Sequence, residues 1–131
     1  TGDLKIPDGS LAVGNISNSA TDGRIDASND IVAFSTSDIR LKNNIKSIKG
    51  ALDKVMLIQG VEFDWEENKE VHGNSGRDVG VLAQEIEQVL PEVVTTRDNG
   101  YKAVKYEKII PLLIEAIKDL NDKLDKCGCS K

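Results

Sequence analysis

Two residues in a polar stretch of the chain, Ser37 and Lys42, have the side chains of a serine–lysine catalytic dyad. A serine hydroxyl is a poor nucleophile until a base removes its proton, and lysine can be that base only when it is neutral. Free lysine has a pKa of about 10.4, so fewer than about one in a thousand is neutral at pH 7. Lowering that pKa to about 7 to 8 requires desolvation of about 4 kcal/mol, which an unfolded or monomeric chain does not supply.

The spacing of the pair sets a second condition. Residues five apart lie on different sides of a helix and on opposite faces of a strand, so the two side chains meet only across a turn. A turn fits here, because a strand-like pattern ends near Phe34 and a helical pattern begins near Asn43. Such a pair also occurs by chance in many loops, so the spacing alone favours an ordinary polar loop.

The composition is that of a soluble globular protein with one modest domain and an appendage, since 39% of the 131 residues are hydrophobic and 30% are charged. The longest apolar run, residues 109–117, is too short to span a bilayer and contains Glu115, so no membrane partner is expected. Residues 1–10 show no signal-peptide pattern. The net charge of -5 argues against binding to nucleic acid.

No cofactor or metal is expected from the remaining reactive residues. Cys127 and Cys129 form a terminal "CGC" that is neither a disulfide framework nor a four-ligand metal spacing. His72 has no convincing ligand partner nearby in sequence, so a solvated loop residue is the preferred interpretation.

Residues 1–36 contain four of the eleven glycines and no long helical period. Three short alternations predict strands that are broken by turns and are too short and polar to close a core alone. We expect these strands to pack against other structure, such as copies of themselves. The alternating pairs are Leu4 and Ile6, Leu11 and Val13, and Ile31 and Ala33.

A helical pattern then begins at residue 43, where Asn43 or Asn44 is a candidate cap. Gly50 is expected to weaken this helix by about 1 kcal/mol relative to alanine without breaking it. The apolar face that defines the pattern consists of Ile45, Ile48, Leu52 and Val55.

Two hairpins are predicted in the middle of the chain. Residues 60–65 alternate as a strand, with Phe63 and Trp65 in its core-facing set, and a polar tip (66–78) separates them from a second apolar run at 79–83. A short helix at 84–90 ends at Pro91. Residues 93–106 then read as a strand, an Asn-Gly turn and a strand.

The last element has the most regular pattern, a heptad seam over residues 107–127. Pro111 falls in its first turn, where the missing amide hydrogen costs little. The seam predicts that this helix self-associates. It is weaker evidence for the number of chains that associate. Its members are Ile110, Leu113, Ile117, Leu120, Leu124 and Cys127.

Three motifs in this order carry a family resemblance: "SDIRLKNNI" (37–45), "GVLAQEIEQVLPEVV" (80–94) and "YEKIIPLLIEAIKDLNDKL" (106–124). Over about residues 37–126 the chain closely resembles the C-terminal intramolecular chaperone domain of phage tailspikes, tail fibres and neck appendages. This family is also called the endosialidase-type chaperone or peptidase S74 family.

The resemblance implies a homotrimer that folds an attached fibre or appendage, brings its chains into register, and then cuts itself off. Residues 1–36 are then the end of a β-stranded shaft, and 37–131 the chaperone, with 107–127 as its assembly helix. The expected fold is α+β: a small part rich in β-hairpins with short helices, and a long C-terminal helix in a trimeric, coiled-coil-like bundle. The expected location is a virion-associated precursor that is assembled in the bacterial host cytoplasm and loses the chaperone after cleavage.

The resemblance also assigns roles at the polar stretch. It places the scissile bond between Thr36 and Ser37, with Ser37 as nucleophile and Lys42 as general base. Asp38 and Arg40 also belong to the motif, and a local ion pair or cap that shapes the turn is preferred over proton transfer for both.

Three further residues are predicted around this site. Leu41 is expected in the core. Gln84 and Glu85 are candidate supporting polar groups, although an exposed helix N-terminus explains them equally simply. Two other functions stay open: a non-catalytic trimerisation module, in which Ser37 is only a turn residue, and a receptor-binding fibre tip that uses the loop at 66–78.

Overall fold

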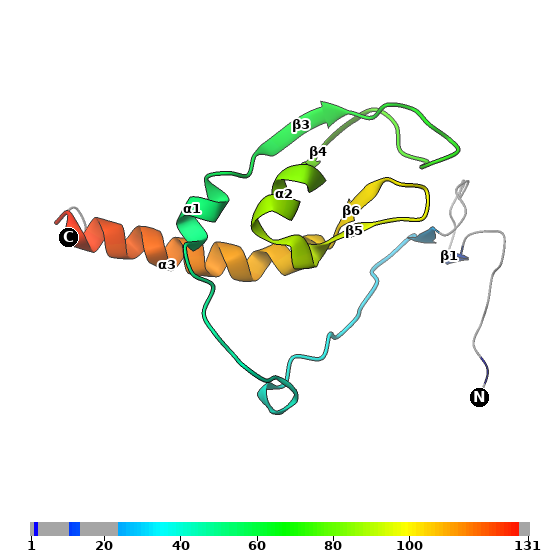
Figure 1. Cartoon of the computed structure of the whole chain (residues 1–131). Helices are drawn as coiled ribbons and strands as arrows, with labels where there is room; N and C mark the ends of the chain where they lie inside the picture. The colour runs from blue at the N-terminus through cyan, green and yellow to red at the C-terminus, as the bar shows by residue number, and fades with distance from the viewer. Residues whose placement is uncertain (1, 3–10, 14–23, 129–131) are drawn as a thin grey trace. The chain divides into compact units, whose positions relative to one another are not determined.

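A computed structural model of the chain describes residues 2, 11–13 and 24–128. These residues fall into two compact units. The first contains the described residues up to position 42 together with residues 65–76, and the second contains residues 43–64 with those from 77 to 128. The fold is mixed, with small two-stranded sheets, short helices and one long C-terminal helix (Figure 1).

The first unit contains one strand pair. Strand β1 (Leu11–Val13) pairs in parallel with β2 (Ile25–Ala27), so the two strands do not form a hairpin. The strand predicted at Leu11–Val13 is confirmed. The strand predicted around Ile31 is wrong, since this residue lies in irregular chain and is 69% exposed. The alternation predicted at 4–6 lies outside the described residues.

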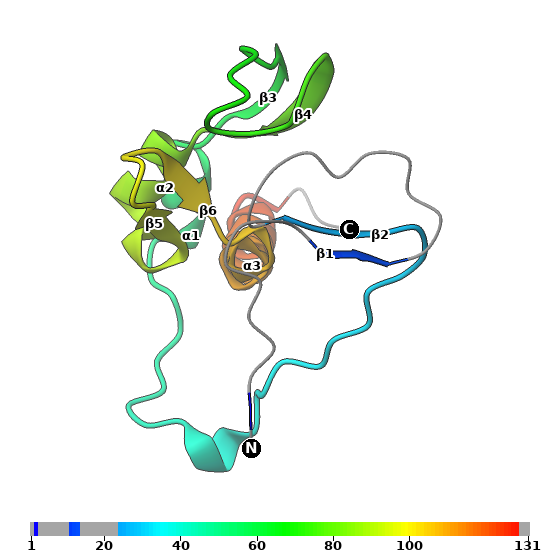
Figure 2. The ribbon, with the colours of Figure 1, turned by 90° about the vertical axis from the view of Figure 1, so that its right-hand side faces the viewer.

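The second unit is organised around α3 (Ile110–Lys126), which follows a 3₁₀ turn, η3 (Tyr106–Ile109). The predicted C-terminal helix is confirmed, with Pro111 in the first turn. The short helix α1 (Ala51–Val55) lies against α3 (Figure 2), and the side chains buried in their interface are Ala51, Leu112 and Ala116.

The helix predicted from residue 43 is wrong over its first half. Asn44 and Gly50 have positive φ angles of 54° and 64°, which a right-handed helix does not allow, and α1 starts only at Ala51. No side chain of α1 caps its N-terminus. Instead, the Asp119 carboxylate on α3 accepts a hydrogen bond of 3.2 Å from the Leu52 amide.

The first predicted hairpin is confirmed. Strand β3 (Gly60–Asp64) pairs antiparallel with β4 (Arg77–Val81), which starts two residues earlier than expected. Gly80 in β4 has a close neighbour, since a Cβ there would lie 2.5 Å from the Tyr106 Oη, which would have to move. That same hydroxyl oxygen accepts a hydrogen bond of 3.1 Å from the Val81 amide.

The second predicted hairpin and the helix before it are also confirmed. Helix α2 (Ala83–Val89) ends before Pro91, which starts the 3₁₀ turn η2 (Pro91–Val93). Strands β5 (Val94–Thr96) and β6 (Lys102–Val104) then pair antiparallel. Their connecting turn contains Gly100 at φ 85°, a conformation that favours glycine.

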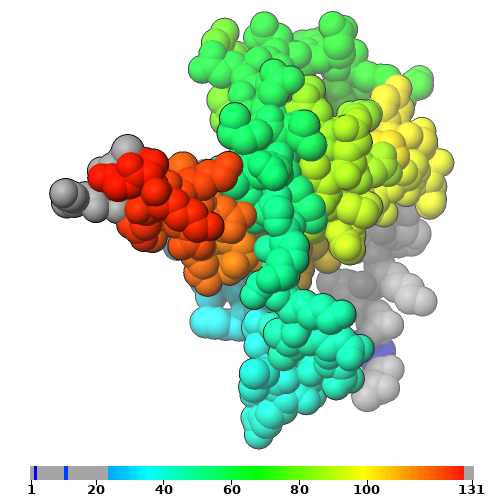
Figure 3. All heavy atoms as spheres, turned by 60° about the vertical axis from the view of Figure 1, so that its left-hand side comes forward, coloured from blue at the N-terminus to red at the C-terminus, as the bar shows by residue number. Residues whose placement is uncertain are grey.

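Helix α3 carries a second apolar face beside the one that α1 covers. The five aliphatic residues of the predicted seam are between 42% and 67% exposed, whereas Leu112 is fully buried. The C-terminal turns of α3 extend past α1 (Figure 3). We call this exposed set the α3 stripe; its residues are Ile110, Leu113, Ile117, Leu120 and Leu124.

Candidate functional site

A single 3₁₀ turn, η1 (Ile39–Leu41), brings Ser37 and Lys42 together. Ser37 precedes the N-cap residue of this turn, and Lys42 is its C-cap. The Lys42 Nζ donates a hydrogen bond of 2.8 Å to the Ser37 Oγ. The structure thus contains a turn between the two residues, and their polar atoms are in direct contact.

The turn is held by Asp38 and Arg40. The Asp38 Oδ1 accepts hydrogen bonds from the Arg40 backbone amide at 2.8 Å and from Arg40 Nε at 3.0 Å. Its other oxygen accepts from a terminal guanidinium nitrogen of Arg40 at 2.8 Å. We call this arrangement the Asp38–Arg40 clamp, and it has the local ion-pair and cap geometry that the sequence favoured.

The clamp keeps both of its side chains charged. The hydrogen bonds from the Arg40 side chain, and then from its backbone amide, lower the pKa of Asp38 below its ordinary value of 3.8. The same side-chain bonds raise the pKa of Arg40 above its ordinary value. The positive charge of Lys42 lowers the pKa of Asp38 further, so Lys42 and the clamp interact electrostatically.

Apolar side chains surround this site without being buried. Leu41, which was expected in the core, is 72% exposed, and Ile39 is 71% exposed. A one-turn helix is too short to bury a face within a single chain. Ser37 and Lys42 are exposed as well, so a single chain leaves the pair in contact with water.

The two other supporting candidates, Gln84 and Glu85, belong to the second unit. Glu85 accepts hydrogen bonds of 2.8 Å from the Gln59 backbone amide and of 2.8 Å from its side-chain amide. These bonds join α2 to the residue before β3, which is a structural role. Gln84 is exposed. Sequence reasoning missed Gln59, because partners 26 residues apart leave no local pattern.

The hairpin tip carries the single histidine. His72 is half-buried, and its ring lies 4.9 Å from the Trp65 ring at an interplanar angle of 49°. Its Nδ1 accepts a hydrogen bond of 3.1 Å from the Asn74 amide. His72 lies in a loop, as expected, but its side chain is only partly exposed because it packs against Trp65.

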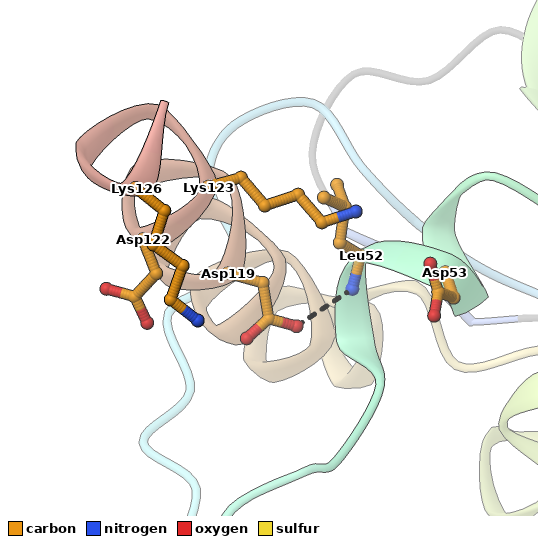
Figure 4. A pocket seen from close by; sticks show the side chains of 6 residues that line it. All are labelled: Leu52, Asp53, Asp119, Asp122, Lys123 and Lys126. Carbon is orange, nitrogen blue, oxygen red and sulfur yellow. Dashed lines mark hydrogen bonds between the residues drawn. The ribbon is translucent and has the colours of Figure 1, made fainter. Parts of the chain in front are cut away.

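A shallow pocket of about 200 Å³ lies between α1 and α3 (Figure 4). On its α3 side Asp119 and Asp122 are each followed four residues later by a lysine, Lys123 and Lys126, which is typical of a solvated helix face. One of its carboxylates is already bound to the Leu52 amide. The lining residues are Leu52, Asp53, Asp119, Asp122, Lys123 and Lys126.

Among the described residues, no cluster of three or more His, Cys, Asp or Glu side chains is arranged to hold a metal ion. None of the helices in the described ranges is long and apolar enough to cross a membrane.

Residues 37–95 match the sequence profile of the family described as "chaperone of endosialidase", a peptidase family. Over these residues the chain is similar to that family. The match begins at Ser37, the residue that the resemblance places directly after the scissile bond. The family resemblance seen in the three sequence motifs is therefore confirmed.

Curated relatives of the chaperone segment are phage fibre proteins. The chain is 39% identical over 93 residues to the long tail fiber protein Gp37 of Enterobacteria phage K3, and equally to that of phage T2. It is 30% identical over 100 residues to the Gp37 of Enterobacteria phage M1. The alignments cover 67% to 73% of this chain, but 7% of the K3 and T2 proteins and 39% of the M1 protein.

Proposed function

We propose that residues 37–131 are an intramolecular chaperone that trimerises a phage fibre or appendage protein and then releases itself by cutting the Thr36–Ser37 bond. Similarity to the chaperone of endosialidase family and to long tail fibre proteins supports a fibre-associated chaperone role. The observation that carries the proposed cleavage is the 2.8 Å contact between Lys42 Nζ and Ser37 Oγ.

The chemistry needs no separate substrate pocket, because the scissile carbonyl belongs to the residue before the nucleophile. Neutral Lys42 takes the Ser37 hydroxyl proton while Oγ bonds to the Thr36 carbonyl carbon through a five-membered ring. The carbon–nitrogen bond then breaks, and the proton passes from Lys42 to the leaving Ser37 nitrogen. Because both reactants are in one dipeptide, their effective concentration is high.

The product of this acyl shift is an ester between Thr36 and the Ser37 hydroxyl. Water adds to the ester carbonyl, and the carbon–Oγ bond breaks. The two products are a fragment that ends in the Thr36 carboxylate and a fragment that begins with Ser37 and its free amine. Residues 37–131 then leave as the spent chaperone.

Trimerisation supplies the timing in this proposal. In a single chain the Lys42 Nζ donates to the Ser37 Oγ, whereas a general base must accept the hydroxyl proton. Burying the exposed pair against neighbouring chains favours the neutral amine, after which the serine hydroxyl donates to it. The α3 stripe is the surface that would hold three chains together. Cleavage would thereby report completed assembly.

A second function remains in competition, a trimerisation module without catalysis. It is favoured by the α3 stripe, an apolar surface that assembly would use with or without cleavage, and by the exposure of Ser37 and Lys42 in one chain. In both cases the chain is assembled on a fibre precursor in the host and becomes part of, or is shed from, the virion.

Intact mass measured over time separates these two functions. The parent chain should lose residues 1–36, while Ser37→Ala and Lys42→Ala should stay whole as trimers. Ser37→Cys is a matched control, since a thiol can also accept the acyl group. If the parent and both alanine variants remain equally intact as trimers, the catalytic proposal fails and the assembly module stands. Efficient cleavage by a monomeric variant would contradict the timing.

A further inference from the structure

We infer that the Asp38–Arg40 clamp is a positioning device for the Ser37–Lys42 pair, setting both the contact between the two side chains and the balance of charge beside Lys42. The inference rests on the proposed self-cleavage and adds two residues to it. From the sequence, Asp38 and Arg40 are expected only to shape a turn. The geometry gives them a specific relation to the reacting atoms.

The clamp sets the contact by fixing the turn that separates the pair. Five residues of extended chain span roughly 17 Å, so Ser37 and Lys42 meet only because residues between them turn back. Two backbone bonds of 3.1 Å close the turn, from the Leu41 amide to the Asp38 carbonyl and from the Lys42 amide to the Ile39 carbonyl. An isolated 3₁₀ turn is weak by itself.

The Asp38 carboxylate accepts three hydrogen bonds from Arg40, one from the backbone amide and two from the guanidinium. These bonds hold Asp38, the N-cap of the turn, against Arg40 two residues later. The apolar side chains of the turn are exposed and make no comparable contribution in a single chain. The clamp is therefore the main visible restraint on the turn, and Ser37 and Lys42 flank it directly.

The clamp also balances the charge beside Lys42. A lone carboxylate next to lysine favours the protonated amine, which cannot act as a base. Asp38 is within electrostatic range of Lys42, and its charge is matched by the bidentate guanidinium of Arg40. The pairing lets Asp38 cap the turn while a guanidinium matches its charge beside Lys42.

Substitutions at the clamp should separate these two effects. Asp38→Ala removes the cap and the ion pair together, and the cleavage rate should fall about tenfold. Asp38→Asn keeps an oxygen that can accept from the Arg40 amide, so its maximal rate should stay within about threefold of the parent. This rescue by Asn distinguishes positioning of the turn from a simple need for negative charge.

The pH dependence should move in opposite directions for the two halves of the clamp. Asp38→Asn leaves the Arg40 cation unpaired, which favours the neutral amine, so the midpoint of the pH–rate profile should move to lower pH. Arg40→Gln leaves the Asp38 carboxylate unpaired, so the midpoint should move to higher pH. Arg40→Lys keeps the charge and is the matched control, with little movement of the midpoint.

The variants are compared as full chains, with melting temperatures measured in a Ser37→Ala background that keeps the trimer intact. The inference is supported if Asp38→Ala slows cleavage at least fivefold without lowering the melting temperature, and if the two midpoints move oppositely. An unchanged rate, a melting temperature that falls with the rate, or midpoints that move together would overturn it. Ser37→Ala decides the proposed function separately, since its continued cleavage, or a parent trimer that stays as intact as this variant, contradicts self-cleavage itself.

One measurement of the clamp does not depend on cleavage. In the full chain, nuclear Overhauser contacts should join the Ser37 β-protons to the Lys42 ε-protons. We expect these contacts in the parent and in Asp38→Asn, and their loss in Asp38→Ala. If they persist in Asp38→Ala, the clamp does not position the pair.

Discussion

The turn at residues 37–42 and helix α3 are built in opposite ways. The turn is held by polar bonds between residues two to five apart, and its apolar side chains are exposed. Helix α3 is held by apolar burial against α1 and by a bond between residues 67 apart, from the Leu52 amide to Asp119. The contacts of the proposed chemistry are therefore local, whereas the scaffold depends on distant contacts.

This difference separates assembly from chemistry. A local turn forms its serine–lysine contact within one chain, so what it lacks for catalysis is exclusion of water. Helix α3 has one apolar face covered by α1 and one left open, so what it lacks is a partner. In our account one event, association of three chains, supplies both. Substitutions on α3 should then change assembly and cleavage together, and substitutions in the turn should change cleavage alone.

The largest effect is expected on the open face of α3. Ile117→Asp places a charge in the centre of the α3 stripe. Each chain of the trimer then loses about 1.5–3 kcal/mol of stabilisation from apolar burial at this position. Sedimentation velocity should show monomers, and intact mass should show no cleavage. Lys118→Asp is the matched control on the neighbouring exposed position. Trimers that form and cut normally with Ile117→Asp would contradict the account.

The covered face of α3 should respond in a different measurement. Leu112→Ala removes a fully buried side chain from the interface with α1, at an expected loss of about 2–5 kcal/mol in the free energy of unfolding. Denaturant unfolding of the monomer measures this loss. Ile117→Ala is the control, because Ile117 lies on the open face of α3 and its truncation should cost less in a single chain. An equal loss for both alanine variants in a monomer would show that the two faces of α3 do not differ.

Packing between β4 and η3 offers a third, smaller effect. In Gly80→Ala the new methyl group meets the Tyr106 hydroxyl, and we expect a loss of about 1–3 kcal/mol in unfolding free energy. Adding Tyr106→Phe removes the clashing oxygen. This second substitution also loses the hydrogen bond from the Val81 amide, but the combined loss should be smaller than the sum of the two single losses. Additive losses in the double variant would exclude the clash.

The smallest effect concerns the turn itself. Because Arg40 lowers the pKa of Asp38 below 3.8, the contribution of the clamp is present above about pH 3.8 and is lost as the pH falls through the lower folded value. Amide exchange at Arg40 in the Ser37→Ala chain should accelerate in that acidic window. Asp38→Asn should show no such transition. A parent turn that is unchanged down to the lowest pH at which the fold survives would contradict a clamp that depends on ionised Asp38.

The same contrast explains what the sequence predicts well. The heptad of α3, the Asn-Gly hairpin and the turn between Ser37 and Lys42 follow from residues close together in the chain, and all three are present. The helix predicted from residue 43 fails because Gly50 takes a left-handed conformation and starts α1 there. Propensity gives a glycine penalty but does not show which backbone conformation it adopts.

Distant contacts account for the other failures. The parallel pairing of β1 with β2, the cap from Asp119 and the bonds of Glu85 to Gln59 join segments without a shared local pattern. Leu41 is apolar and was expected in a core, yet the turn around it is too short to bury it within one chain. Its exposure is consistent with a role for neighbouring chains that a single sequence pattern does not show.

The most direct test of the central claim is to trap the ester at Thr36. Freshly purified full-length trimer is incubated with and without hydroxylamine, and the fragments are identified by mass. Our account predicts faster release with hydroxylamine, a Thr36 hydroxamate on residues 1–36 and a second fragment that begins at Ser37, with neither product from Ser37→Ala. Cleavage at another bond, or release that hydroxylamine does not change and Ser37→Ala does not stop, would contradict it.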